Sequence, residues 1–327
     1  MLRRPTGRPL MAAAIGRRLA IFLLSLLGAS IIVFAVCSAL PGAVAEVMLG
    51  EGATEEQVLA LTAELGLDRP VTVRYLEWLG GMLTGDFGTS YFSGQGVLEL
   101  MAPRVAVTVW LVVLALLLSV AVAVPVGMVA AMKRRSWVGF AATTAAQVGM
   151  AVPAFWAAIG LVLVFAVGLR WLPANGYVPL LRDPLGWASH LVLPVISLAI
   201  VQSAVLVRYV RSAFLEVLSE DYYRTARAVG WRPFPALLRH GLRNAALSLV
   251  TVVGLQLSAV LVGAIVIEQV FALPGLGTQL LSAVSQRDLF IVQGVVMFLA
   301  ASVLLINFLV DLSYAWIDPR LRTGQRR

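Results

Sequence analysis

Six runs of apolar residues, separated by polar stretches, set the pattern of this 327-residue chain. A helix that crosses the hydrocarbon core of a bilayer needs about 20 predominantly apolar residues. The runs cover residues 19–40, 105–131, 138–168, 190–207, 245–267 and 290–314. The third run is long and contains Pro153, which predicts a kinked or tilted helix, and the fourth is short. The pattern therefore predicts an all-α integral membrane protein with six transmembrane helices.

Basic residues are distributed unevenly between the polar stretches. The stretches before the first run, between the second and third, between the fourth and fifth, and after the sixth hold 19 of the 25 basic residues. Because cytoplasmic stretches of membrane proteins carry the excess of Lys and Arg, we expect both termini in the cytoplasm. The expected division is a cytoplasmic tail (1–18), a first span (19–40), an extracytoplasmic segment (41–104), a five-span domain (105–314) with a cytoplasmic loop (208–244), and a cytoplasmic tail (315–327).

The composition supports a membrane protein and disfavours several soluble classes. Hydrophobic residues make up 60% of the chain and charged residues only 13%, too few to cover the surface of a soluble domain of this size. The net charge of +8 does not indicate nucleic-acid binding, because the basic residues form short clusters between apolar runs and not one basic domain. The single cysteine, Cys37, excludes an internal disulfide and a CxxC metal motif.

The extracytoplasmic segment is expected to fold into helices. Thr54 and Gln57 have the spacing of a capping box, and Gly66 stands where a helix that begins there would end. Pro70 suits the first turn of a second helix. Two roles are open for this segment: a helical plug over the mouth of the bundle, or a docking surface for an external partner.

The cytoplasmic loop contains the longest polar stretch in the second half of the chain, EDYYRTARAVGWRPFPALLRHGLRN at 220–244. Ser219 is expected to cap a helix at its N-terminal end. Tyr222, Ala226 and Val229 are spaced so that they share one face of this helix. The first half of the stretch therefore predicts a short amphipathic helix.

The second half of the stretch predicts a sharp stop and a return to the membrane. Arg224 and Arg227, three residues apart, are expected to project together from the helix. Gly230 is expected to end the helix, and Pro233 and Pro235 prevent its continuation. A second amphipathic stretch, ALLRHGLRNAAL, then leads into the fifth apolar run. A short helix between two breaks can transmit a push from a cytoplasmic partner to the span that follows.

The sequence YYRTARAVGWRPFPALLRHGLRNA resembles the cytoplasmic EAA loop of ABC-importer permeases, in the version of the dipeptide, oligopeptide and nickel permease family. Five other stretches resemble this family in the same order: LGLDRPVTVRYLEWLGGMLTGDFGTS (65–90), VPAFW (152–156), EQVFALPGLG (268–277), RDLFIVQGVV (287–296) and NFLVDLSYAWIDPRLR (307–322). The resemblance covers nearly the whole chain. Val229 departs from it, because the family usually has lysine there.

The resemblance implies a permease subunit of an ATP-driven, binding-protein-dependent importer in the bacterial inner membrane. The implied partners are a second homologous permease, two cytoplasmic ABC ATPases that use ATP and Mg, and an extracytoplasmic substrate-binding protein. The implied substrates are di- or oligopeptides, with nickel chelates or glutathione-type peptides as the alternative. A coupling helix at 219–230 would fit the ATPase. The implied coupling residues are Asp221, Tyr222, Tyr223, Arg224, Thr225, Ala226, Arg227, Gly230, Arg239, His240, Arg243 and Asn244.

No enzyme signature occurs in the chain itself. A P-loop needs a lysine after a glycine-rich stretch, whereas the only lysine, Lys133, lies in AMKRRS. His190 and His240 are too isolated in the sequence for a metal site or a catalytic pair. We therefore expect no catalytic, cofactor-binding or metal-binding residue. A self-sufficient secondary transporter, the alternative from another class, would need charged residues inside the spans, and only Glu268 and Asp311 come close.

A few polar residues in or near the spans are candidates for a translocation path or gate. They are Thr143, Gln147, Gln202, Gln256 and Glu268. The alternative role of the hydroxyl and the amides is hydrogen bonding between helices. The alternative for Glu268 is a position at the membrane interface. The residues after it, Pro274, Gly275 and Gly277, are expected to form a turn.

Overall fold

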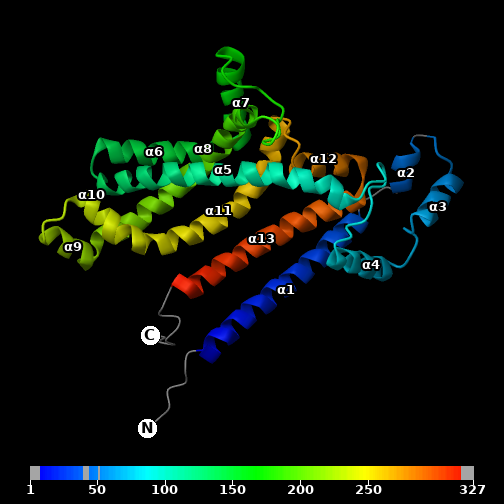
Figure 1. Ribbon diagram of the computed structural model, residues 1–327, viewed down its shortest axis with the longest axis horizontal. Coiled ribbons are helices and arrows are strands. Elements are labelled where there is room, and N and C mark those ends of the chain that lie inside the picture. The colour runs from blue at the N-terminus through cyan, green and yellow to red at the C-terminus, as the bar shows by residue number, and fades with distance from the viewer. Residues whose placement is uncertain (1–7, 40–43, 51, 318–327) are drawn as a thin grey trace, which may run out of the picture. The chain divides into compact units, whose positions relative to one another are not determined.

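The computed structural model describes residues 8–39, 44–50 and 52–317, and it leaves aside the side chains of residues 8–14, 240, 242–248 and 314–317. The first seven and last ten residues of the expected cytoplasmic tails lie outside this range. Helices make up most of the described chain (Figure 1). Within the described ranges the only β-pairing is an isolated antiparallel bridge between Thr89 and Gly96. The predicted all-α class is confirmed.

In the part of the chain that the structure describes, five helices are long and apolar enough to cross a membrane. They are α1 (Arg8–Ser38), α5 (Val97–Met132), α8 (Pro184–Ser219), α11 (Leu242–Val270) and α13 (Leu289–Ile317). A sixth crossing requires α6 (Trp137–Ala151) together with α7 (Ala154–Leu161) and the π-helical segment η1 (Val162–Gly168), two parts that are bent by 98°. The structure thus agrees with five or six spans, depending on whether this bent pair forms one.

The bend lies where the sequence predicted a kink, and it is a complete break in the helix. Pro153 has no N–H to donate, and its ring disfavours the helical conformation of the residue before it. Val152 accordingly has extended backbone angles, φ −84° and ψ 119°. The third apolar run is therefore two helices with different directions.

Shorter helices connect the long ones. They are α2 (Val44–Leu49), α3 (Glu55–Glu64), α4 (Val71–Thr84), α9 (Asp221–Ala228), α10 (Pro233–Ala236), the π-helical η2 (Leu237–Gly241) and α12 (Leu276–Gln286). The sequence did not predict α12. Its buried residues include Leu276 and Ala283, which lie two turns apart on one face.

α8 is longer than the fourth apolar run, which was predicted at 190–207. The helix continues through two arginines to Ser219, so the loop predicted at 208–244 begins inside a helix. The helix continues because its apolar face extends beyond the end of the apolar run. This face continues through the buried residues Val210, Phe214 and Val217.

The chain divides into two compact units. The first comprises Met1–Ile15, Val109–Leu273 and Ile306–Arg327, and the second comprises Gly16–Thr108 and Pro274–Leu305. α1, α5 and α13 contribute residues to both units. The loop between α8 and α11 belongs entirely to the first unit.

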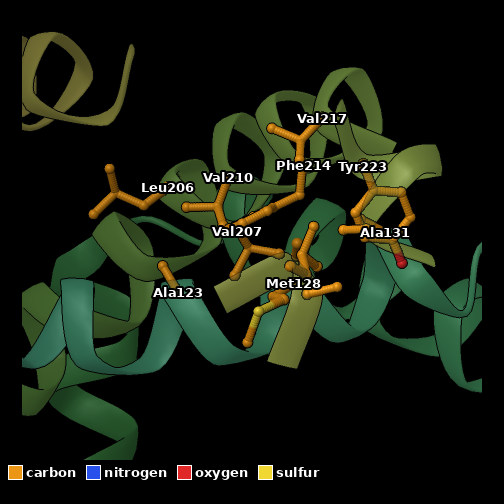
Figure 2. Packing of buried hydrophobic residues seen from close by; sticks show 13 residues of the cluster. Ala123, Met128, Ala131, Leu206, Val207, Val210, Phe214, Val217 and Tyr223 are labelled. Carbon is orange, nitrogen blue, oxygen red and sulfur yellow. The ribbon is translucent and has the colours of Figure 1, made fainter. Parts of the chain in front are cut away.

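α8 forms the centre of the first unit, where it packs against α6, α7 and α11. Its buried residues join those of α5, α9 and η2 in one hydrophobic core (Figure 2). α5 and α8 approach each other closely at Gly127, where an added Cβ atom would lie 2.6 Å from Cγ1 of Val210. Because a real Cβ atom cannot come so near, only glycine permits this approach of the two helices.

Two hydrophobic clusters hold the second unit together. The larger joins α1, α5, α12 and α13 around Val97, Met101 and other buried residues. The smaller packs α4 against α1 through the rings of Phe34, Tyr75 and Trp78, with 5.4 Å between the ring centroids of Phe34 and Tyr75. Their tilted and edge-on arrangement is the one that aromatic pairs prefer.

The helix ends in the second unit confirm the capping predictions. The Gln57 N–H donates to Oγ1 of Thr54 at 3.3 Å, and the Thr54 N–H donates to Oε1 of Gln57 at 2.9 Å, which completes a capping box. Gly66 follows the end of α3 with a left-handed φ of +65°. Pro70 is the N-cap of α4. The predicted helices of the 41–104 segment are therefore present.

Candidate functional site

α9 begins one residue after α8 ends. Ser219 is the last residue of α8, and its hydroxyl donates to the carbonyl of Glu216 at 2.7 Å. The N-cap of α9 is Glu220, which has an extended conformation and no side-chain cap. The predicted cap at Ser219 is therefore wrong, because α8 continues further than expected and uses this hydroxyl on its own last turn. A single extended residue separates the two helices.

One face of α9 is anchored in the core of the first unit. Tyr223 and Ala226 are buried in the same cluster as Phe214 and Val217 of α8, as Figure 2 shows for Tyr223. Tyr222 and Trp231 pack against this cluster from its edge. This contact fixes α9 to the end of a membrane-spanning helix.

Val229 does not share the buried face that the sequence predicted for it. Its side chain is 75% exposed, because the helix ends at Ala228 and Val229 is the C-cap. Tyr223, which the spacing argument left out, takes a place in the core instead. The predicted face is thus correct for Tyr222 and Ala226 and wrong for Val229.

Gly230 ends α9 as predicted. Its φ is +98°, a conformation that residues with a side chain rarely adopt. The Gly230 N–H donates to the Arg227 carbonyl at 3.1 Å, and the Trp231 N–H donates to the Ala226 carbonyl at 3.2 Å. These two bonds form a Schellman motif, which turns the chain sharply after the helix.

The other face of α9 is polar and exposed. The Arg224 side chain is 70% exposed, and its guanidinium lies 3.6 Å from an even more exposed carboxylate, that of Asp221. An exposed pair of this kind contributes little to stability. Arg227 is also exposed and donates through Nη1 to the Trp231 carbonyl. Thr225 donates to the Asp221 carbonyl at 2.9 Å. Two arginines are therefore available to another protein.

The chain returns to the membrane through α10 and η2. The Arg239 guanidinium lies 5.3 Å from the centre of the Trp231 ring, a cation–π contact. Gly241 is buried, and an added Cβ atom there would lie 2.8 Å from Cγ1 of Val217. No pattern in the sequence indicated that this glycine is needed for packing. The predicted coupling residues His240, Arg243 and Asn244 have side chains outside the described part of the chain.

Two of the candidate path residues meet in the structure. Nε2 of Gln256 on α11 donates to Oε1 of Gln202 on α8 at 3.0 Å, and Gln202 is buried. Thr143 donates to the Gly139 carbonyl of its own helix, α6, at 2.8 Å, and Gln147 is exposed on the same helix. Interhelical hydrogen bonding, the alternative role, therefore describes the glutamine pair.

The Glu268 side chain is buried inside the protein. Near the C-terminal end of α11 its exposed fraction is 0%. Its carbonyl accepts the Leu273 N–H at 2.9 Å, which closes the turn that follows α11. The predicted turn continues to Gly275, the N-cap of α12, but the prediction is wrong for Gly277, which lies in the first turn of that helix because α12 already begins at Leu276. Within the described ranges there is no group of three or more His, Cys, Asp or Glu residues that could hold a metal ion.

Two family models match this chain, one in its N-terminal part and one in its C-terminal part. Residues 123–323 match the family described as binding-protein-dependent transport system inner membrane component, and residues 11–112 match the family described as the N-terminal part of such membrane components. The chain is 42% identical over 313 residues to a protein of Brucella melitensis biotype 1 whose name provisionally describes a peptide transport system permease, covering 96% of this chain and 99% of the relative. It is 39% identical over 332 residues to the dipeptide transport system permease protein DppB of Escherichia coli strain K12, covering 94% of this chain and 97% of the relative.

Proposed function

The chain belongs to the family of binding-protein-dependent transport system inner membrane components, and from this premise we propose that it forms half of the translocation path for di- and oligopeptides. Membership makes it a multi-pass inner-membrane permease subunit of an ABC importer and not an enzyme. The observation that carries the substrate class is the near full-length similarity to permeases named for peptide and dipeptide transport.

The energy for transport comes from separate ATPase subunits in this proposal. α9 is the coupling helix: its buried face holds it to α8, and its exposed Arg224 and Arg227 contact acidic or carbonyl groups of an ATPase. The remaining partners are a second permease subunit and an extracytoplasmic binding protein that delivers the peptide. ATP and Mg are bound by the ATPases.

Uptake by the assembled complex tests the substrate class. The permease is expressed with its partner permease, two ATPases and binding protein, and the complex is reconstituted in proteoliposomes. We expect ATP-dependent uptake of labelled dialanine, and none when an ATPase without its catalytic carboxylate replaces the normal one. Uptake of a nickel chelate in place of peptides would overturn the proposed substrate and keep the importer.

Cysteine labelling tests the predicted sidedness. Single cysteines at Ala53 and Ser219, in a chain with Cys37→Ser, are exposed to a reagent that does not cross the membrane. We expect labelling of intact cells at the first position only, because the 41–104 segment is placed outside and the end of α8 inside. Equal labelling at both positions would contradict this topology.

A further inference from the structure

The second unit contains a pocket of about 310 Å³ that is lined by both polar and apolar residues. Its lining comes from the turn at 90–93, the first turns of α5, the helix α12 and the residues before α13. The predicted sidedness places these segments at the extracytoplasmic ends of the spans. Three of the lining residues, Arg104, Gln279 and Asp288, have side chains that can bind charged or peptide groups.

Asp288 has a buried carboxyl group with an oxygen that lacks a partner among the described residues. Only 1% of the residue is exposed. Its Oδ2 accepts the Ser90 hydroxyl at 2.5 Å, whereas its Oδ1 has no hydrogen bond to any described residue. The residue directly precedes α13, where the positive end of the helix dipole favours a negative charge. A residue that lines the pocket therefore carries an acceptor oxygen with no hydrogen bond to the described residues.

Gln279 adds a second group of this kind. The residue lies on α12 and is 5% exposed, and neither Nε2 nor Oε1 of its amide has a hydrogen-bond partner among the described residues. Buried polar atoms in proteins nearly always have partners. The side chain offers both a donor and an acceptor, which is the complement of a peptide group.

Arg104 supplies the opposite charge. Its half-buried side chain lines the same pocket, and its one hydrogen bond to a described residue is a long one, 3.4 Å from Nη1 to the Leu100 carbonyl of its own helix. A guanidinium binds carboxylates through paired N–H groups. A carboxylate residue, an arginine and an amide residue therefore line the same pocket.

We infer that this pocket binds a small zwitterionic peptide, with its ammonium group on Asp288, its carboxylate on Arg104 and its peptide group on Gln279. The inference rests on the proposed peptide-transport function and names the residues of this chain that would recognise the cargo. The volume lies at the lower end of the range of ligand pockets, about 300–1,000 Å³, which favours a di- or tripeptide over a longer chain.

Blocked peptides test the charge recognition. The complete complex in lipid nanodiscs, without binding protein or nucleotide, is titrated with dialanine, N-acetyl-dialanine and dialanine amide. We expect each blocked peptide to bind about tenfold more weakly than dialanine, because each loses one charge-assisted hydrogen bond. Equal binding of all three would overturn the inference, and so would the absence of dialanine binding in a complex that imports dialanine. Absence of dialanine uptake by the wild-type complex would instead count against the proposed function.

Two variants and a control separate a binding role from a structural one. Asp288→Asn is expected to weaken dialanine binding by about tenfold. Gln279→Leu is expected to weaken binding and also to raise the thermal stability of the complex, because it removes two buried polar atoms without partners. Glu77→Gln neutralises an exposed carboxylate outside the pocket, and it should change neither the affinity for dialanine nor the thermal stability of the complex.

The outcome for Gln279→Leu decides the case even if Asp288→Asn does not fold. Higher stability with unchanged dialanine affinity would mean that the amide is merely unsatisfied, and the inference would be wrong. Higher stability with lower affinity supports it, since an amide with only a structural role has no reason to affect the ligand.

Discussion

Replacing Gly230 by valine is expected to misdirect α9 while the spans remain folded. The residue has φ +98°, and an added Cβ atom there would meet no atom within 4 Å. The cost of the substitution therefore comes from the backbone and not from a clash. A left-handed backbone costs an L-residue about 1–2 kcal/mol, and a β-branched residue is among the least tolerant.

The size of this penalty determines how much function is lost. A change of about 1–2 kcal/mol alters the ratio of two conformations by about 5–30-fold. Burial of one large side chain, such as Tyr223 on the same helix, contributes about 1.5–3 kcal/mol. These two free energies are similar in size. The backbone strain at residue 230 is therefore large enough to oppose the burial of Tyr223 that holds α9 in place. We expect a large but incomplete loss of coupling.

Peptide uptake and peptide-stimulated ATP hydrolysis by the reconstituted complex measure the loss. Gly80→Val is the matched control, because Gly80 has an ordinary φ and the same open space around an added Cβ atom. We expect Gly80→Val to transport at nearly the wild-type rate, and Gly230→Val to reach normal abundance with uptake reduced by about 5–30-fold. Wild-type uptake by Gly230→Val at equal abundance would refute the role assigned to the turn.

Four other changes test separate parts of the structure. The double variant Arg224→Ala, Arg227→Ala should reach the membrane normally and lose most uptake, and normal uptake would leave these arginines as membrane anchors only. Burial raises the pKa of Tyr91 to about 12. Because the unfolded chain ionises this tyrosine near pH 10, the free energy of unfolding should fall by about 2–3 kcal/mol as the pH rises from 10 to 12. The difference in phenolate absorbance between the wild type and Tyr91→Phe measures this pKa. Gln256→Leu removes the donor to a buried amide of α8 and should lower the thermal stability by about 1 kcal/mol. Gly127→Val should cost about 1–3 kcal/mol by overpacking, seen as a lower melting temperature, whereas an unchanged value would show that α5 and α8 can separate freely.

The long helices could be predicted because each depends on many residues at once. A run of about 20 apolar residues is stable in few environments except a bilayer. The end of α8 was missed because hydropathy falls at its arginines, although Val210, Phe214 and Val217 continue the apolar face. The signal for the longer helix was therefore present in the helical spacing and absent from the hydropathy.

The coupling loop was predictable where the chemistry is local. Gly230 and the two prolines act on their own backbone, so the end of α9 followed from the residues themselves. Ser219 can cap a helix or end one, and only the continuation of α8 decides between these. Gly241 depends on Val217 of another helix, which no local pattern identifies. The polar pocket was missed for the same reason, since its residues come from separate parts of the chain.

The length of α8 has a mechanical consequence. Its 36 residues extend about 54 Å, well beyond a hydrocarbon core of about 30 Å. The amide pair at Gln202 lies about 25 Å along the axis from Ser219, so a rotation of about 10° around that pair would move the far end by about 4 Å. Because one residue joins this end to α9, and Tyr223 and Ala226 fasten α9 to the same core, we expect a displacement of the short helix to be accompanied by a tilt of α8.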